Sequence, residues 1–255
     1  MEQKARVRLE IKNISKSFEL KKNSRIQVID NISFNVKDNE FLMLLGPGHC
    51  GKTTLLSIIT GLMPSDSGEV LLDGQKVTKA NPKMGMVFQK IGLLPWKSVI
   101  ENVELGPKMR GLNRKDCQEK AMYYLKLVGL NGFENSYPYE LSGGMKQRVG
   151  IARAYANDPE ILILDEPFGQ LDAQTRYSMQ EEIIRIWEKE RRTIIFVTNN
   201  IEEAVFLGDE IFLFTKCPAR LKQIYPINLS RPRDMIDSEF LEIRKEISDN
   251  FDLSI

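Results

Sequence analysis

One short segment of the chain has the composition and spacing of a loop that binds phosphate. It fits the pattern G-x-x-x-x-G-K-[ST] and reads Gly46-Pro47-Gly48-His49-Cys50-Gly51-Lys52-Thr53. Glycines in such a loop let backbone N–H groups curl around phosphate oxygens, and a helix that follows adds the positive end of its dipole. We expect Lys52 to reach the β- and γ-phosphates of a nucleotide and the Thr53 hydroxyl to bind Mg²⁺, with Thr54 next to them.

Two adjacent carboxylates, Asp165 and Glu166, follow an apolar run much later in the chain. The run Ile161–Leu164 predicts a buried strand, so the carboxylates would lie at the carboxyl edge of a sheet, where α/β proteins bind ligands. We expect Asp165 to hold the Mg²⁺ shell and Glu166 to polarise an attacking water as a general base. The alternative is a solvated pair at the end of a strand, which a phosphate loop in the same chain disfavours.

Short apolar runs and helical stretches alternate along the sequence. The phosphate loop follows one such run and precedes the helical stretch Thr54–Ile59, which is the context that its pattern requires. Buried strands between helices predict an α/β core with an inserted helical lobe. The predicted strands are Val7–Ile11, Ile32–Val36, Phe41–Leu45, Glu69–Leu72, Met84–Phe88, Ile161–Leu164, Thr193–Val197 and Glu210–Phe214. The clearest predicted helices are Asp116–Val128, Met145–Ala156, Gln174–Arg191 and Ser238–Ile247.

Composition limits the classes of partner and compartment. The 255 residues include 36 basic and 35 acidic side chains, and this balance argues against nucleic acid as a partner. The three cysteines, Cys50, Cys117 and Cys217, have no metal-ligand spacing and predict free thiols in a reducing compartment. The sequence predicts neither a secretory signal nor a membrane span, so we expect a cytosolic protein that reaches membranes only through a partner.

A third motif, Leu141-Ser142-Gly143-Gly144-Met145-Lys146-Gln147-Arg148, narrows the class of phosphate-loop protein. It predicts a second helix start that binds anions, because a serine hydroxyl and glycine amides face outward there. The motif resembles the LSGGQ-type signature of ABC ATPases, in which this surface closes onto the γ-phosphate held by another subunit. The resemblance implies ATP and Mg²⁺ as ligands, and Ser142, Gly143 and Gly144 as contacts to the nucleotide.

The resemblance to ABC ATPases extends over nearly the whole chain. Phe18 matches the aromatic residue that stacks on adenine, Gln89 the glutamine that senses Mg²⁺ and the transmembrane partner, and Asp172 the aspartate that crosses the dimer interface. The implied fold is an α/β P-loop NTPase (RecA-like) core with an N-terminal antiparallel β subdomain and an inserted helical subdomain. We expect one domain over residues 1–255, with the helical subdomain at about 90–158 and a helical tail at about 231–255.

Two positions depart from the family pattern. Asn199 stands where importer ATPases usually carry a histidine that bonds the γ-phosphate, and Asn200 replaces the usual aspartate. The asparagine amide can donate a hydrogen bond but cannot take up a proton. Loss of a donor to the transition state commonly slows an enzyme about 10²–10³-fold. The hypothesis is that the chain binds MgATP normally, hydrolyses it slowly as a homodimer, and can pair with a complete ATPase.

The only histidine of the chain, His49, lies in the phosphate loop where a glycine is usual. A histidine is tolerated but uncommon at a position that requires positive φ. Two interpretations follow: His49 is a bystander on the loop, or it lies near the phosphates and partly replaces the donor missing at Asn199. The first is favoured, because such loops accept many side chains at the x positions.

The segment after Gln89 resembles one group of importers. Leu93-Leu94-Pro95-Trp96, followed by the V-x-x-N-V run Val99–Val103 and by Arg231-Pro232-Arg233-Asp234 in the tail, is similar to ATPases of nitrate, sulfonate and taurine importers. The resemblance implies transmembrane permease subunits, a second ATPase subunit and, indirectly, a periplasmic or extracellular solute-binding protein. It implies a peripheral position on the cytoplasmic face of the cell membrane. Trp96 is either part of the docking surface for the permease or a core residue of the helical lobe.

Two other functions compete with the importer ATPase. Non-transport ABC proteins that act on ribosomes or DNA usually carry two cassettes or a long coiled-coil insert, and this sequence has neither. A degenerate regulatory cassette would bind ATP without hydrolysing it. Lys52, Asp165 and Glu166 argue against that alternative, whereas Asn199 argues for it. The sequence leaves the solute, the permease and the identity of the second subunit undecided.

Overall fold

The computed structural model of the chain describes residues 6–19 and 24–251, which belong to two compact units. Unit 1 comprises Met1–Asn81 and Thr193–Ile255, and unit 2 comprises Pro82–Arg192. The outermost parts of the predicted domain and tail, residues 1–5 and 252–255, lie outside the described residues. None of the helices in the described part of the chain has the length and apolar content needed to cross a bilayer.

Unit 1 contains an antiparallel sheet with the strand order β2-β1-β4-β5. Its strands are β1 (Val7–Glu19), β2 (Arg25–Lys37), β4 (Ser67–Leu72) and β5 (Gln75–Lys76). Leu9 and Ile11 of β1 are buried and alternate with more exposed residues, as expected of a strand with one face on a core. Asp73 and Gly74, with φ of 49° and 76°, join β4 to β5 in the manner of a type I′ turn. The turn comes directly after the predicted strand Glu69–Leu72, and β1 and β2 are longer than predicted.

A second sheet of unit 1 has the order β10-β9-β3-β8. Its strands are β3 (Phe41–Leu45), β8 (Thr193–Thr198), β9 (Glu210–Phe214) and β10 (Leu221–Pro226). β3 runs parallel to β8 and β9, and every residue of β3 and β8 is buried, which explains their unbroken apolar sequences. β10 pairs antiparallel with β9 and was not predicted, because most of its side chains reach solvent and its sequence is correspondingly polar.

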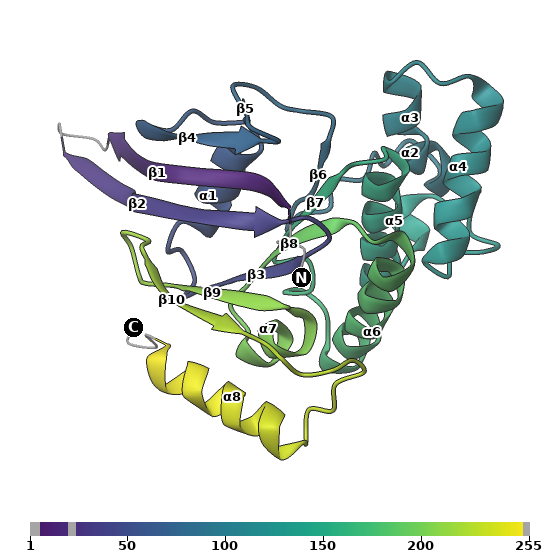
Figure 1. Ribbon diagram of the computed structural model, residues 1–255. Coiled ribbons are helices and arrows are strands. Elements are labelled where there is room, and N and C mark those ends of the chain that lie inside the picture. Colours follow the sequence, from purple (N-terminus) through teal and green to yellow (C-terminus); the bar gives the residue numbers. More distant parts are fainter. Residues whose placement is uncertain (1–5, 20–23, 252–255) are drawn as a thin grey trace. The chain divides into compact units, whose positions relative to one another are not determined.

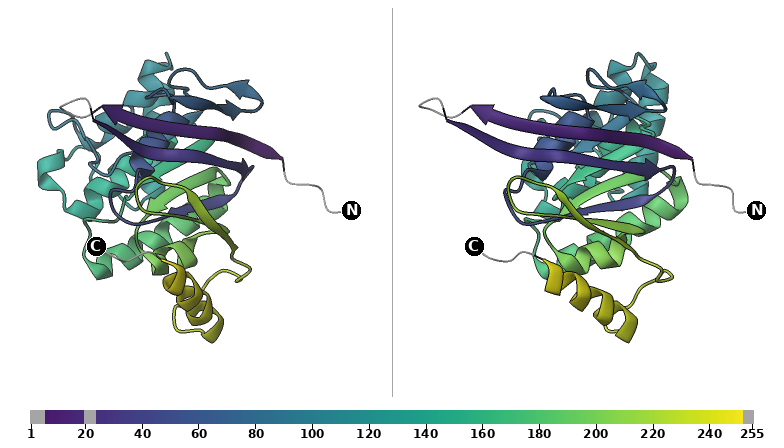
Figure 2. Two further views of the ribbon diagram at one scale, coloured as in Figure 1. Left: turned by 90° about the vertical axis from the view of Figure 1, so that its left-hand side faces the viewer. Right: turned by 60° about the vertical axis from the view of Figure 1, so that its left-hand side comes forward.

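Three helices belong to unit 1: α1 (Lys52–Ile59), α7 (Ile201–Leu207) and α8 (Ser238–Asn250). α1 begins where the phosphate loop ends. α7 packs against β3 and β8, and α8 packs on α7 (Figure 1). Both views of Figure 2 show α8, drawn in yellow, as the outermost element on its side of this unit. The predicted C-terminal helix is therefore present and longer by three residues than predicted.

Unit 2 contains a parallel strand pair and most of the helices (Figure 1). The strands are β6 (Met84–Val87) and β7 (Ile161–Asp165). The helices are α2 (Val99–Val103), α3 (Leu105–Met109), α4 (Arg114–Leu127), a short 3₁₀ helix (Pro138–Glu140), α5 (Gly143–Ala156) and α6 (Ala173–Glu190). α5 contacts α2, α3, α4 and α6, so it is the central helix of the unit. The predicted helical stretch, residues 90–158, lies within this unit together with β6, β7 and α6.

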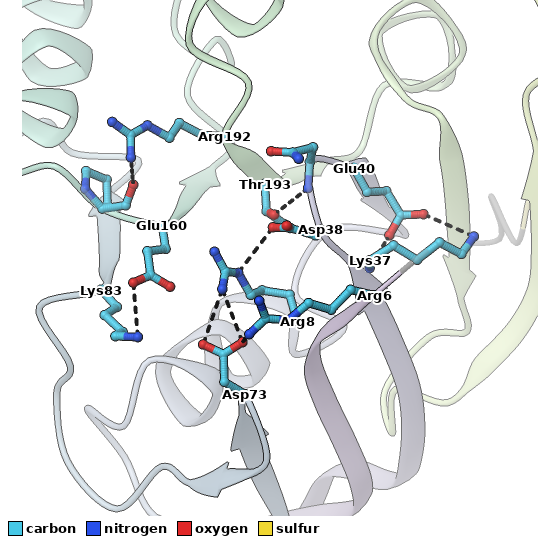
Figure 3. Close-up of polar contacts among 12 residues, drawn as sticks. Arg6, Arg8, Lys37, Asp38, Glu40, Asp73, Lys83, Glu160, Arg192 and Thr193 are labelled. Carbon is cyan, nitrogen blue, oxygen red and sulfur yellow. Dashed lines mark hydrogen bonds and ion pairs between the residues drawn. The ribbon is translucent and has the colours of Figure 1, made fainter. Parts of the chain in front are cut away.

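Ion pairs gather at residues that precede the buried strands (Figure 3). In unit 1 the Arg8 guanidinium contacts the carboxylates of Asp38, at 3.2 Å, and Asp73, at 3.1 Å. In unit 2 the Lys83 ammonium lies 3.0 Å from the Glu160 carboxylate, directly before β6 and β7. Asp38, Lys83 and Glu160 come shortly before β3, β6 and β7, so these three residues lie at the amino ends of buried strands, opposite to the carboxyl ends where the site is predicted. Asp73 instead follows β4. The predicted α/β class and the N-terminal antiparallel sheet are confirmed.

Candidate functional site

The phosphate loop of unit 1 follows the carboxyl end of β3. The last residue of that strand, Leu45, pairs with Thr198 of β8, and the Gly46 N–H donates to the Thr198 carbonyl oxygen at 3.4 Å. A Cβ added to Gly46 would lie 3.2 Å from the Phe214 Cβ, so only glycine fits without adjustment of this neighbour. The loop is therefore fixed at its start by two neighbouring strands.

Lys52 is the first residue of α1, and its side chain folds back into the loop. It is 5% exposed, and its Nζ donates to the carbonyl oxygens of Gly46 at 2.8 Å and Pro47 at 2.7 Å. Its charge is thus held at the centre of the loop, at the positive end of the α1 dipole. An anion that enters the loop would meet both the ammonium group and the N–H groups of the first turn.

Two residues of the loop adopt left-handed backbone conformations. Gly51, the residue before α1, has φ of 113°, and a Cβ there would lie 2.8 Å from the Val28 Cγ1. His49 has φ of 59° and an exposed side chain, so the positive φ anticipated for this position is observed. Gly51 therefore supplies both the turn and the close packing that direct the loop into the helix.

The remaining loop residues differ in exposure. Cys50 is 1% exposed, and this burial raises the pKa of its thiol. Thr53 is exposed on the first turn of α1, and Thr54 is half-buried. The residues fit a magnesium nucleotide, because the Thr53 hydroxyl is a hard oxygen donor beside the phosphate cradle. The described residues include no cluster of three or more acidic, histidine or cysteine ligands, and Mg²⁺ in NTPases needs none, since phosphates and water molecules supply most of its ligands.

Asn199 lies next to the start of the phosphate loop within unit 1. It follows Thr198, which pairs with Leu45 directly before Gly46, and its side chain is exposed. The next residue, Asn200, is the N-cap of α7, and its side-chain oxygen accepts the Glu203 N–H at 3.1 Å. Asparagine caps a helix as well as aspartate does, so the change at position 200 preserves this local structure.

Phe18 lies in β1 of unit 1, opposite Ile26 of β2. Its ring is half-buried, and the Lys16 Nζ lies 5.7 Å from the ring centroid. The ring thus retains exposed area, as stacking on a base requires.

The predicted metal and base residues lie in unit 2, at the carboxyl ends of its two parallel strands. Val87 of β6 pairs with Leu164 of β7. Gln89 and Glu166 each come two residues later, so the register brings them to the same edge. Asp165 is only 3% exposed at the end of β7, whereas Gln89 is exposed. Glu166 has φ of 43°, a left-handed conformation that is uncommon for glutamate and that turns the chain sharply after the strand.

The signature motif forms the start of α5. The Ser142 hydroxyl caps the helix by accepting the Met145 N–H at 3.3 Å, and a Cβ on Gly144 would lie 2.8 Å from the Thr175 Cγ2. Ser142 and Gly143 are exposed. An open hollow of about 500 Å³ borders this helix start and is lined in part by Ser142, Gly144, Arg148 and Thr175.

Asp172 caps α6, as Ser142 caps α5. Its carboxylate accepts the Thr175 N–H at 3.0 Å, and this hydrogen bond lowers the pKa of Asp172. Asp172 is exposed, so it can contact another subunit while it caps α6.

Two organising residues of unit 2 were not assigned a role from the sequence. Asn102 is fully buried; its Oδ1 accepts the Leu94 N–H at 2.8 Å, and its Nδ2 donates to the carbonyl oxygens of Leu94, Lys97 and Ser98 at 3.0–3.1 Å. These bonds shape the corner that presents Trp96, whose side chain is 71% exposed and therefore not a core residue. An amide on the buried side of the short helix Val99–Val103 is the signal that identifies this position.

Arg153 of α5 is the second organising residue. It donates to the carbonyl oxygens of Ile91 at 2.7 Å and Gly92 at 2.9 Å. The helix that starts at the signature therefore also holds the segment that follows Gln89. No local sequence pattern links these two positions, because 61 residues separate Gly92 from Arg153.

Comparison with known proteins identifies the family. The ABC transporter family profile matches residues 29–169. A taurine import ATP-binding protein of Rhizobium johnstonii is 42% identical over 247 residues, which cover 94% of each chain. An aliphatic sulfonates import ATP-binding protein of Bacillus cereus is 42% identical over 95% of each chain. An uncharacterized ABC transporter ATP-binding protein of Methanocaldococcus jannaschii is 50% identical over 95% of this chain and 90% of its own.

A solved structure agrees with this result. It is a dimeric, post-hydrolysis state of an ATP-binding cassette bound to ADP and inorganic phosphate. Its chain is 30% identical, with a TM-score of 0.76 over 87% of this chain and 100% of the other. The predicted P-loop NTPase fold and the predicted resemblance are both confirmed, and the chain belongs to the ABC transporter family.

Proposed function

We propose that the chain hydrolyses ATP to drive an importer for a small anion such as taurine, a sulfonate or nitrate. The observation that carries this proposal is the phosphate loop, in which the buried Lys52 ammonium lies among carbonyl groups at the start of α1. The two relatives named for import of taurine and aliphatic sulfonates support the class of solute.

The residues of unit 1 have distinct roles in binding ATP. Backbone N–H groups of the loop and of the first turn of α1 donate to phosphate oxygens, and Lys52 exchanges its carbonyl partners for the β- and γ-phosphates. Phe18 stacks on the adenine. The Asn199 amide donates a hydrogen bond to the γ-phosphate. Thr53 and Asp165 would hold Mg²⁺, which would supply positive charge beside the phosphates.

The residues of unit 2 act on hydrolysis and on partners. Glu166 accepts a proton from the attacking water, and Gln89 positions that water and the metal shell. Ser142, Gly143 and Gly144 bind the γ-phosphate held by a second ATPase subunit, and Asp172 contributes to that interface. The exposed corner around Trp96 docks on the permease at the cytoplasmic face of the membrane. A solute-binding protein on the other side of the membrane delivers the anion to that permease.

Turnover tests the catalytic part of the proposal. Glu166→Gln should lower the ATP hydrolysis rate of the purified chain by about 10²–10⁴-fold, because a general base contributes that much, with ATP affinity retained. Glu188→Gln, a change on the exposed face of α6, is the matched control and should leave the rate unchanged. Equal rates in the wild type and Glu166→Gln would remove Glu166 as the base.

Asn199 favours a second candidate, a regulatory cassette that binds ATP with slow hydrolysis beside a complete ATPase. If Asn199 limits the rate, Asn199→His should increase turnover of the purified chain about 10²-fold by restoring the donor. Ordinary ABC turnover that Asn199→Ala leaves unaffected would contradict slow hydrolysis. A loss of turnover in His49→Gly, with ATP binding retained, would identify His49 as the substitute donor.

Docking and solute are tested with the assembled system. Trp96→Ala should reduce co-purification with the permease and leave ATP affinity unchanged, whereas the exposed control Tyr177→Ala should leave both unchanged. Uptake of taurine, an aliphatic sulfonate and nitrate by cells that carry the complete system then identifies the solute. Uptake of none of these anions would reject the proposed solute class without affecting the proposed ATPase.

A further inference from the structure

The carboxyl end of α7 is closed by two arginines of the C-terminal tail. The last carbonyl groups of a helix lack partners within it. Arg233 donates to the carbonyl oxygens of Val205 and Gly208 at 2.7 Å, and Arg231 donates to that of Leu207 at 2.5 Å. The guanidinium groups also bring positive charge to the negative end of the helix dipole.

Arg233 is built into the fold. It is 7% exposed, and burial lowers the pKa of its guanidinium to about 10, so the group remains charged at neutral pH. It also donates to Leu229 within the tail at 3.2 Å and to Phe206 at 3.2 Å. The buried Arg233 charge favours this one packing of the tail on α7. In any other position the guanidinium would lose the carbonyl oxygens that accept its hydrogen bonds.

The tail also contacts the amino end of α7. The Arg244 guanidinium of α8 lies 3.2 Å from the Glu202 carboxylate in the first turn of α7. α8 packs on α7 and buries Phe240 and Ile247. The tail therefore holds this seven-residue helix at both ends, and so short a helix has little stability of its own.

α7 is fixed on its inner side as well. A Cβ on Gly208 would lie 2.4 Å from the Met43 Cγ of β3. The Asp209 carboxylate accepts the Phe41 N–H at 2.9 Å and the Arg231 guanidinium at 2.7 Å. The tail, α7 and the strand that leads into the phosphate loop thus form one packed set within unit 1.

Asn199 depends on this set for its position. Its side chain is exposed, and the residues on either side fix its backbone. Thr198 lies in β8, and Asn200 caps α7 and donates its N–H to the Thr198 Oγ1 at 3.0 Å. A shift of α7 would therefore move Asn199 relative to Gly46, whereas Lys52 and Gly51 would keep their own contacts.

We infer that Arg231, Arg233 and Arg244 form a clamp on α7 that positions Asn199 for ATP hydrolysis, and this inference rests on the proposed function. They are positioning residues, since they act through α7. Relaxation of the clamp changes the rate of hydrolysis and spares ATP binding, which depends on the phosphate loop.

The test uses the purified full-length chain with MgATP. Arg233→Gln should lower turnover about tenfold, because a small displacement of a reacting group has effects of this size, and should change the Kd for ATP less than twofold. In the Asn199→Ala background the same change should cause no further loss, since a clamp that acts through Asn199 has nothing left to position. Lys245→Gln, which removes an exposed charge from α8, is the control and should leave turnover unchanged.

Hydrogen exchange provides a readout that does not depend on catalysis. Amides of Ile201–Leu207 should exchange faster in Arg233→Gln, and those of β3 should not. If Arg233→Gln fails to fold, Arg231→Gln and the exposed Arg244→Gln replace it, and the turnover of each is again compared with and without Asn199→Ala.

Three results would overturn the inference. They are unchanged turnover in the arginine variants, unchanged exchange of α7, or an equal loss of turnover in the presence and absence of Asn199. A wild-type chain that binds ATP without hydrolysis contradicts the proposed function itself. Turnover that is insensitive to Asn199→Ala but sensitive to Arg233→Gln also overturns the inference, since the arginines would then act through another residue, and it leaves the proposed ATPase activity standing.

Discussion

Two helix starts in this protein have the composition of anion sites, but they are built differently. In unit 1, α1 follows Gly51, which packs closely against Val28, and the Lys52 ammonium is enclosed by carbonyl groups of the loop. In unit 2, α5 follows Ser142, whose hydroxyl caps the helix, and Ser142 and Gly143 face solvent. The first is made of backbone around a buried cation, and the second of exposed side-chain and amide groups.

Because of this difference, we expect the start of α1 to bind a ligand tightly and the start of α5 only to contact it. A preformed cradle with an internal charge loses little entropy on binding, so it should dominate the affinity for the nucleotide. An exposed helix start without an enclosed cation contributes when another surface brings an anion to it. Unit 2 is organised throughout by side-chain hydrogen bonds, from Ser142, Asp172, Asn102 and Arg153. Substitutions in the two units should therefore change different properties.

The largest expected effect follows loss of the enclosed cation. Lys52→Met should weaken ATP binding roughly 100-fold, because hydrogen bonds from a charged donor contribute about 1.5–3 kcal/mol each. The same substitution in the other helix start, Lys146→Met, should change the affinity of the isolated chain less than twofold. Calorimetric titration with MgATP measures both values. An equal loss of ATP affinity in the two variants would contradict the distinction between the two helix starts.

Removal of the buried amide in unit 2 should lower stability instead of ATP affinity. Asn102→Ala removes the partner of the Leu94 N–H and of the Lys97 carbonyl oxygen, whereas the Leu94 and Ser98 carbonyl oxygens keep backbone N–H donors. Unsatisfied buried groups cost about 2 kcal/mol. Denaturant unfolding should show this loss, and permease binding through the Trp96 corner should weaken with it. Gln118→Ala, on the exposed face of α4, is the control. A variant of normal stability would mean that the corner does not depend on this amide.

The same contrast explains what could be predicted from the sequence. The phosphate loop and the strand before it were predictable, because Gly51, Lys52 and the apolar run Phe41–Leu45 lie next to each other in the chain. The role of Asn102 was not predictable from pattern alone, since it depends on which face of a short helix is buried. Contacts across long separations, such as Arg153 with Gly92 or Arg233 with Val205, leave no local periodicity.

A smaller effect should follow loss of the signature cap. Ser142→Ala should lower the free energy of unfolding by about 1 kcal/mol, the usual contribution of an N-cap side chain, and leave ATP affinity unchanged. Ser142→Asn separates the two roles of this serine, because asparagine also caps a helix. It should restore stability but not the turnover that depends on the hydroxyl. Recovery of both properties would mean that the serine acts only as a cap.

The smallest effect concerns the reactivity of a thiol at the start of α1. A helix start and a nearby lysine normally lower the pKa of a cysteine, but burial dominates at Cys50 and raises it. Since the thiolate is the reacting form, a maleimide should label the exposed Cys217 before Cys50. Labelling of Cys50 should accelerate about tenfold for each pH unit between pH 7 and pH 9, because its pKa lies above that range. Peptide mass spectrometry at timed intervals measures both rates. Rapid labelling of Cys50 at pH 7 would indicate that the phosphate loop is open to solvent. The start of α1 would then be as exposed as the start of α5, which would contradict the difference between the two helix starts.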